Sequence, residues 1–206
     1  DSISFDGNTA TQGGALALSG GSATIKNTLM TNNTAANGGA IYAGATLAVD
    51  NATFASNSAT DSGGALYISA GNTTVENSIL WSNTGTAPAA TLVSGSLSFA
   101  YSAVQGSGGS GSWAGPGTDL GGNISADPQF IDAANGNYEL TPVGPAVDAG
   151  NNALVPAATL TDLAGAPRFV DDLNTPDTGA GSAPIVDMGA LEMPQSPLAS
   201  IGDFVW

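Results

Sequence analysis

The chain has 206 residues; 17 are acidic and only two, Lys26 and Arg168, are basic, so its formal net charge is −15. Nucleic acids and anionic membrane surfaces are poor partners for it, because binding phosphate requires clustered lysine and arginine. The sequence has no cysteine and no histidine, which excludes disulfides, imidazole-dependent catalysis and the usual zinc sites. No run approaches the roughly 18 apolar residues of a membrane span, so we expect no membrane insertion.

The composition favours an all-β fold. Glycine contributes 29 residues and proline 11, and the long Ala/Leu/Glu/Lys runs that helices favour are missing. Apolar residues make up 42% of the chain and charged residues 9%, which argues against disorder.

An internal repeat of about 25 residues dominates the first 83 positions. Its first marker, Gly-Gly-Ala followed by Leu or Ile, begins at Gly13, Gly38 and Gly63. The second marker is an apolar residue followed three places later by asparagine: Phe5/Asn8, Met30/Asn33, Phe54/Asn57 and Leu80/Asn83. The third consists of the runs Ile25-Lys-Asn27, Val49-Asp-Asn51 and Val75-Glu-Asn77. Three unrelated markers with one period indicate stacked structural units.

Each repeat contains three short runs with strand-like alternation, at 40–43, 46–50 and 53–55 in the second repeat. One repeat cannot bury its apolar face alone, whereas stacked rungs can. We therefore predict a right-handed, single-stranded parallel β-helix with rungs of about 25 residues. The predicted inward columns are Leu16/Ile41/Leu66, Leu18/Ala43/Ile68, Ile25/Val49/Val75 and Met30/Phe54/Leu80.

Three columns of polar or aromatic residues follow from this register. Asn8, Asn33, Asn57 and Asn83 should form a structural ladder through amide hydrogen bonds between rungs. Tyr42 and Tyr67 should point outward, where they are candidates for glycan stacking. Lys26, Asp50 and Glu76 should form a small ion-pair ladder, worth little if exposed.

The chain changes character after the third repeat. Residues 91–104 look like a fourth rung without the Gly-Gly corner. The Gly/Ser-rich stretch 106–117 reads as a flexible excursion, with Trp113 either folding back as a lid on the core or exposed as a contact residue. We expect rungs over 1–131, a loop-rich C-terminal cap packed on them over 132–193, and a linker with a terminal strand over 194–206.

Two resemblances extend this interpretation. The Gly-Gly-Ala-Ile and Phe-x-x-Asn pattern resembles the repeats of polymorphic outer-membrane proteins and related secreted β-helices. The motifs between Asp127 and Glu192 resemble the C-terminal end of pectate-lyase-like bacterial β-helix proteins of the choice-of-anchor Q type; they are Asp127-Pro-Gln-Phe130, Tyr138-Glu-Leu140, Pro145-Ala-Val-Asp148-Ala-Gly150, Asp162-Leu-Ala-Gly165-Ala-Pro-Arg168 and Ile185-Val-Asp187-Met-Gly189-Ala-Leu-Glu192. The resemblance implies a right-handed β-helix on a secreted or surface-anchored protein, and no defined activity.

The terminal motifs supply two site hypotheses. Arg168 is expected to clamp Asp148, Asp162 or Asp187 through bidentate bonds and so to fix the cap. Residues 171–177 form an acidic loop. This loop is either an ordinary turn or a calcium site, since carboxylates and amides in a loop are calcium ligands. Its candidate ligands are Asp171, Asp172, Asn174 and Asp177. No cofactor is required otherwise.

Enzymatic readings find little support. A polysaccharide lyase on this fold needs arginine or lysine beside acidic calcium ligands on a strand face, and the two bases are placed elsewhere. Glycoside hydrolysis needs two facing carboxylates, and no pair stands out.

The final hexapeptide Ile201-Gly-Asp-Phe-Val-Trp206 reads as an apolar strand. It resembles the opening strand of B-repeat domains in large bacterial adhesins; alternatively it adds to a neighbour's sheet through Ile201, Phe204, Val205 and Trp206. Our leading hypothesis is a non-enzymatic extracellular or cell-surface building block, a stalk, adhesin segment or filament subunit that associates with itself or with neighbouring domains. The alternatives are a glycan-binding module and a polysaccharide lyase.

Overall fold

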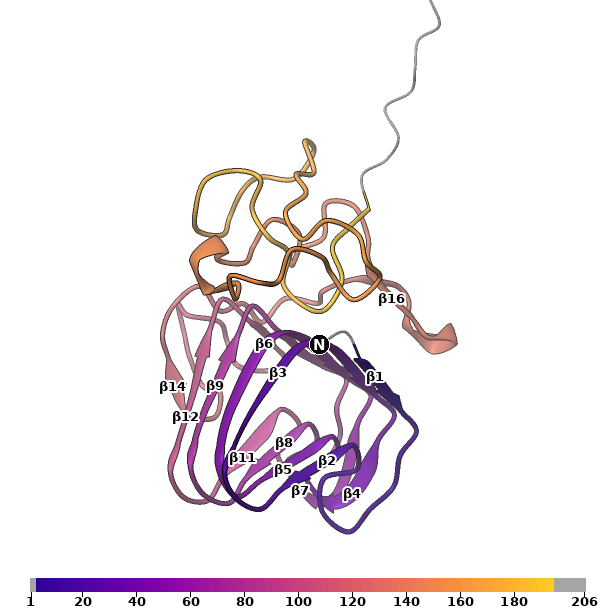
Figure 1. Cartoon of the computed structure of the whole chain (residues 1–206), viewed down its shortest axis with the longest axis vertical. Coiled ribbons are helices and arrows are strands. Elements are labelled where there is room, and N and C mark those ends of the chain that lie inside the picture. Colours follow the sequence, from indigo (N-terminus) through magenta and orange to yellow (C-terminus); the bar gives the residue numbers. More distant parts are fainter. Residues whose placement is uncertain (1–2, 195–206) are drawn as a thin grey trace, which may run out of the picture.

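The computed structural model describes residues 3–194 and has two parts, a solenoid of parallel strands and a loop-rich C-terminal cap (Figure 1). The described residues contain no α-helix, only the two 3-10 turns η1 (Ala133–Asn135) and η2 (Asn152–Leu154). The predicted all-β parallel β-helix is confirmed as a parallel β-solenoid.

Three parallel sheets form the walls of the solenoid. The largest contains β1 (Ile3–Asp6), β3 (Ser22–Thr31), β6 (Thr46–Ala55), β9 (Asn72–Glu76), β10 (Ile79–Trp81), β12 (Ser96–Ala100), β13 (Ala103–Val104) and β14 (Thr118–Asp119). The second contains β2 (Leu16–Leu18), β5 (Ile41–Ala43), β8 (Leu66–Ile68) and β11 (Ala90–Leu92), and the third pairs β4 (Thr34–Asn37) with β7 (Ser58–Ser62). Every pairing within these sheets is parallel, as stacked rungs require.

The register follows the repeat period. Ile3 pairs with Thr28, an offset of 25 residues. The offset is 24 residues between β3 and β6, 26 between β6 and β9, and 24 between β9 and β12. Equivalent positions therefore superpose from rung to rung, and a side chain meets its own counterpart.

The predicted inward columns form the core of the solenoid. Ile41, Leu66, Val49, Val75, Met30, Phe54 and Leu80 all have 0% exposure. Fully burying one such side chain contributes about 1.5–3 kcal/mol, and a column repeats that gain on each rung. The first-rung residues Leu16, Leu18 and Ile25 pack against the same cluster but are only half-buried.

Glycine is required at one corner of each of the first three rungs. Gly38 has φ +66°, and a Cβ there would overlap the carbonyl of Ile41. A different corner uses asparagine in the left-handed region, with φ between 45° and 48° at Asn27, Asn51 and Asn77. Tyr101 takes the same conformation, φ 47°, on the fourth rung.

The fourth rung forms as predicted, and the excursion follows it between β13 and β14. β11, β12 and β13 pair with β8, β9 and β10. Trp113 packs on Phe99, with ring centroids 5.5 Å apart, and is half-buried against the main core. Of the two interpretations of Trp113, the lid on the core is the one that the structure shows.

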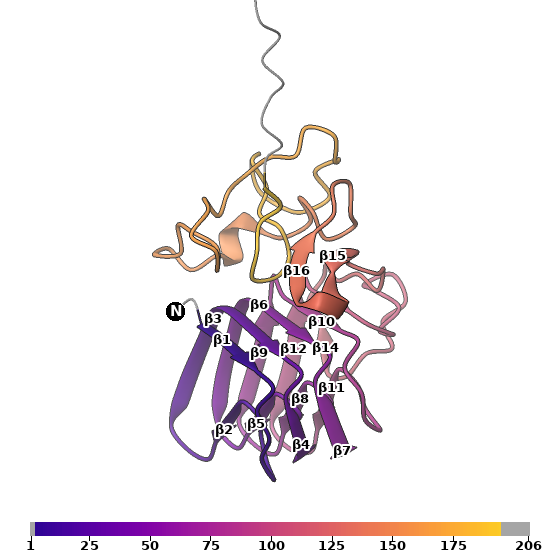
Figure 2. The same cartoon turned by 90° about the vertical axis from the view of Figure 1, so that its right-hand side faces the viewer.

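The C-terminal cap begins with an antiparallel pair, β15 (Phe130–Asp132) and β16 (Asn137–Leu140). In Figure 2 the strands from β1 to β14 follow one another across the view, while the cap lies to one side of the whole row. It therefore spans several rungs laterally. A second apolar cluster joins it to the solenoid, with Ile79 and Ala103 from the rungs packed against Leu140, Val147 and Met188.

Candidate functional site

The four predicted ladder asparagines are brought together as one chain of amides. The Nδ2 atoms of Asn8, Asn33 and Asn57 each donate to Oδ1 of the next asparagine at 2.9 Å, ending at Asn83. Each accepting Oδ1 also receives the backbone N–H of the preceding asparagine at 3.0 Å. Asn33 and Asn57 have 0% exposure. Because the amides of Asn33 and Asn57 form their hydrogen bonds within the stack, these two side chains stabilise the solenoid and are not available to a ligand.

Tyr42 and Tyr67 lie on the outer face of the second sheet and stack on one another. Their ring centroids are 5.3 Å apart and their planes differ by 12°. Both are half-buried, with Ala17 and Thr91 at the equivalent positions of the flanking rungs. Each ring therefore covers one face of the other, and only the outer faces and the edges remain for a sugar to contact.

The register aligns Lys26 with Asp50 and Asp50 with Glu76. Asp50, however, is only 8% exposed, so the middle of this column is not the surface position expected. The pKa of the Asp50 carboxyl is raised to about 6, chiefly by burial and secondly by the adjacent Glu76, with Lys26 acting in the opposite direction. Burial also raises the pKa of Glu76. The column therefore favours the protonated forms of the Asp50 and Glu76 carboxyls more than water does.

The cap attaches to the rungs at the corner occupied by Asn27, Asn51 and Asn77, here called the asparagine corner. Asn27 donates through Nδ2 to the carbonyl of Thr161 at 2.6 Å. Two rungs further on, Asn77 donates to the carbonyl of Asn151 at 3.0 Å and accepts from its N–H at 2.8 Å. Asn51, between them, is fully buried, and its amide has no hydrogen-bond partner within residues 3–194.

Arg168 joins the cap to this corner. Nη1 donates to Glu192 Oε1 at 2.6 Å, and Nη2 donates to Asn27 Oδ1 at 2.7 Å. Both charged side chains are buried, with 0% and 1% of their surface exposed. The expectation that Arg168 clamps Asp148, Asp162 or Asp187 is wrong, because its planar guanidinium faces Glu192 and the asparagine corner. The expected role in fixing the cap agrees with these contacts.

The remaining buried acids of the cap hold backbone segments rather than arginine. Asp187 accepts from the N–H groups of Asp148 at 2.7 Å and Met193 at 2.6 Å. Asp162 accepts from the N–H of Glu192 at 3.0 Å. Burial raises the pKa of Asp187 to about 7 and that of Glu192 well above its ordinary value, with Asp187 adding to the latter. These carboxyls act as fixed acceptors at the centre of the cap.

The acidic loop divides its four candidate ligands into two groups. Asp172 caps a turn, accepting from Thr175 Oγ1 at 2.6 Å and from Asn174 at 3.2 Å. Asp171 and Asp177 instead lie beside Asp148, and one carboxylate oxygen of each comes within 4.8 Å of the others. The structure therefore separates Asp172 and Asn174 from the group that could hold a metal, and adds Asp148 to it.

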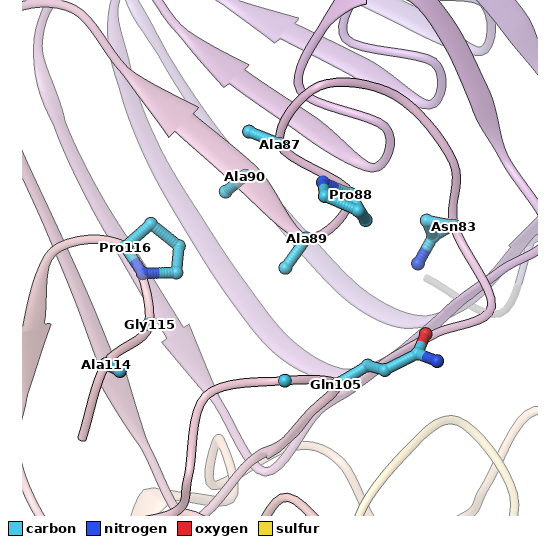
Figure 3. Close-up of a pocket in the computed structure, with 10 residues that line it drawn as sticks. Asn83, Ala87, Pro88, Ala89, Ala90, Gln105, Ala114, Gly115 and Pro116 are labelled. Carbon is cyan, nitrogen blue, oxygen red and sulfur yellow. The ribbon is translucent and has the colours of Figure 1, made fainter. Parts of the chain in front are cut away.

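A pocket of about 540 Å³ opens near the end of the asparagine ladder. Figure 3 shows that it lies between the segment leading into β11, with Pro88 and Ala89, and the excursion around Pro116. Asn83 and Gln105 are the polar residues lining it, and both have committed hydrogen bonds, to Phe54 and from Ser82 respectively. The pocket brings no charged group to a ligand and has no catalytic arrangement.

The sequence did not predict two features of the cap: the asparagines that hold it on the rungs, and the position of Asp148. Asn27 and Asn77 were recognised as repeat markers but not as the docking points of the cap; their signal was that these asparagines recur at a corner without belonging to the ladder. Asp148 is predicted only as one of three alternative partners of Arg168, because its place beside Asp171 and Asp177 depends on a loop more than 20 residues away. The proposed assembly residues Ile201, Phe204, Val205 and Trp206 lie outside the described residues.

The fold and its attachment points define a β-solenoid with a lateral cap. Comparison with protein families adds one match: residues 2–19, 27–44 and 51–69 are similar to the Chlamydia polymorphic membrane protein repeat. The three matched segments fall on successive rungs, and this similarity indicates a surface protein. No curated protein and no solved structure matches the chain. Within residues 3–194, no helix combines the length and apolarity needed to cross a membrane.

Proposed function

We propose that this chain is a non-enzymatic extracellular building block, a β-helical surface stalk or filament subunit that assembles with neighbours. The observation that carries the proposal is the stacking of three repeats, each similar to the polymorphic membrane protein repeat, into one continuous solenoid. A solenoid buries its core through contacts between adjacent rungs, so it projects a long surface without requiring a catalytic centre.

The positions of the two bases support a non-enzymatic role. A lyase base must meet a substrate proton from the solvent side. Arg168 is fully buried and engaged by Glu192 and Asn27. Lys26 is aligned with Asp50 in the strand register, and the carboxylate group found within residues 3–194 that could hold a metal lies in the cap instead.

The buried acids Asp187 and Glu192 of the cap are also poorly placed for glycoside hydrolysis. That reaction needs two carboxyls on either side of an open cleft. Asp187 and Glu192 are close enough to interact, but they are 1% and 3% exposed and their oxygens accept backbone N–H groups. A sugar therefore has no access to this pair.

Assembly is supported by the outer edge of the stack. Among the described residues, β1 and β2 are the outermost strands of their sheets, and Ile3 is 46% exposed. A strand at the edge of a sheet can accept another strand through its backbone groups. The apolar hexapeptide ending at Trp206 is our proposed donor of that strand in a second copy or a neighbouring domain.

Light scattering coupled to size-exclusion chromatography tests the assembly. The full chain should form oligomers whose population rises with concentration, and removal of residues 201–206 should leave monomers. A matched variant replaces Ile201, Phe204, Val205 and Trp206 by serine, which keeps the length of the tail but removes its large apolar side chains, and should also leave monomers. Monomers at every concentration of the full chain would refute the assembly role, and oligomers that persist after deletion would refute the terminal strand.

The alternative of a glycan-binding module rests on Tyr42 and Tyr67. The mutual stacking of the rings leaves each with one free face, which is a smaller platform than two coplanar rings would provide. A glycan array checks this alternative: retained signal that falls in the Tyr42→Ala variant supports it, whereas no binding to any glycan removes it.

The second alternative, a polysaccharide lyase, has a direct assay. Acidic polysaccharides are incubated with the protein and the formation of unsaturated products is followed by ultraviolet absorbance. We expect none with or without calcium. Product formation that survives purification and is lost in Lys26→Ala would overturn the non-enzymatic assignment.

A further inference from the structure

Three carboxylates from two segments of the cap converge on one point. Asp148 precedes η2, whereas Asp171 and Asp177 belong to the acidic loop. One oxygen from each lies within 4.8 Å of the other two. Oxygen ligands about 2.4 Å from a shared calcium ion are separated by up to about 4.8 Å, so these spacings suit a common ion.

Asp148 is the member that needs explanation. It has 0% exposure, and its Oδ1 has no hydrogen-bond partner among residues 3–194. Its Oδ2 accepts only a long bond of 3.3 Å from the N–H of Asp172. A buried carboxylate oxygen without a donor is costly and is rare in native proteins unless an ion or a proton compensates it.

The backbone holds this side chain in place. Asp148 donates its N–H to Asp187 at 2.7 Å, and its carbonyl accepts from the N–H groups of Thr178 and Gly179, both at 3.0 Å. It adopts φ +50°, in the left-handed region. The same residue is therefore anchored to the centre of the cap and to the end of the acidic loop, which fixes its carboxylate relative to Asp171 and Asp177.

The surrounding charges favour a cation. Asp171 and Asp177 lie beside Asp148, so their like charges add to the cost of its buried carboxylate. The guanidinium of Arg168 is engaged by Glu192 and Asn27 and does not reach this group. The cluster thus requires either a proton or a bound cation to offset its negative charge.

We propose that Asp148, Asp171 and Asp177 bind one calcium ion that pins the acidic loop to the centre of the cap. All three ligands are hard carboxylate oxygens, which suit calcium better than softer transition metals. Asp171 is half-buried and Asp177 exposed, so the open side of the site leaves room for water ligands. The inference goes beyond the assembly role and does not depend on it.

Isothermal titration calorimetry with calcium chloride tests the proposal on the full chain after treatment with a chelator. We expect one site, with an affinity between about 10⁻⁵ and 10⁻³ M, and a rise in Tm of about 4 °C in excess calcium. Absence of binding heat together with an unchanged Tm at millimolar calcium would overturn the site, as would binding of magnesium in preference to calcium.

Three variants distinguish this site from one built by the loop alone. Asp177→Asn alters an exposed residue, so the fold should survive while calcium affinity falls at least tenfold. Asn174→Ala removes an amide outside the carboxylate group and should change the affinity less than threefold. Asp148→Asn should abolish binding, and circular dichroism verifies that this buried variant folds. Equal affinity in Asp177→Asn and the wild type, or a loss confined to Asn174→Ala, would refute the proposed ligands.

Discussion

The rungs and the cap both bury many polar side chains, but they satisfy them by different means. In the rungs, Asn33 and Asn57 bond to the same residue type one turn away, with the same 2.9 Å link. In the cap, Arg168, Asp187 and Glu192 find unlike partners at unrelated distances along the chain. In a repeat, one hydrogen-bonding arrangement for a buried polar side chain recurs on successive rungs. In a non-repeating region, each buried polar side chain needs a different partner.

This difference also separates neutral from ionic stabilisation. The ladder uses uncharged amides, whose burial costs little once each is hydrogen-bonded. The cap uses a buried ion pair, for which desolvation cancels much of the attraction while loss of one partner is costly. The cap should therefore respond more strongly than the rungs to single substitutions and to changes in the charge of its side chains.

The largest expected effect is at the ion pair. Arg168→Met leaves Glu192 without a cation and Asn27 Oδ1 without its donor, so we expect a loss of about 3–5 kcal/mol in the free energy of unfolding. Urea denaturation followed by circular dichroism measures it. The double variant Arg168→Met/Glu192→Gln should recover part of the loss, because it removes the orphaned charge; a loss below about 1 kcal/mol in the single variant would contradict this account.

The ladder should show a smaller, position-dependent effect. Asn57→Ala removes one donor to Asn83, one to Met30 and the acceptor for Asn33, at a cost of about 3 kcal/mol. The same substitution at the exposed Asn8 removes one link at the end of the row and should cost about 1 kcal/mol or less. Equal costs, measured in parallel urea denaturations, would show that the ladder does not depend on burial.

A third effect concerns pH and a charged group within the rungs. The folded-state pKa of Asp50 is raised to about 6, so the folded protein binds a proton that the unfolded chain releases above about pH 4. Its stabilising contribution is complete below about pH 4 and is lost as the pH rises through 6. Asp50→Asn should flatten this part of the stability profile by about 2 kcal/mol between pH 4.5 and 7.5. Thermal melts of both proteins across that range compare them; parallel profiles would exclude the effect.

The smallest effect should come from the tyrosine pair. Tyr67→Ala removes the stacking partner of Tyr42, and their coupling should be about 1 kcal/mol. A double-mutant cycle with Tyr42→Ala isolates that coupling from the loss of apolar area. Additive losses in the cycle would show that the rings are neighbours without a stabilising interaction.

The rungs could be predicted from the sequence in more detail than the contacts of the cap. The period, the inward columns and the fourth rung were predictable, because each rung repeats the solution of the last and Phe54 or Leu66 can be read against its counterparts. The partner of Arg168 could not be predicted, because Glu192, Asp187, Asp162 and Asp148 are equivalent as acids, and only the path of the loops decides which one faces the guanidinium. The burial of Asp50 depends in the same way on its packed environment.

The candidate metal group shows where local spacing misleads. Within the loop, Asp171, Asp172, Asn174 and Asp177 resemble a ligand series, but the turn itself consumes Asp172 and Asn174. The third carboxylate comes from Asp148, which becomes a neighbour only after the cap has folded. A short motif can identify the residue types of such a site without identifying its members.

The two docking asparagines have a consequence for how such an array can grow. The cap is hydrogen-bonded to Asn27 and to Asn77, which lie two rungs apart, so it fits only a stack in which these two positions keep that spacing. A rung inserted between these positions would increase the distance between the anchors by about 4.8 Å and break one of them. Rungs added before Asn27 would leave this interval unchanged, so the array can lengthen on that side without disturbing either anchor.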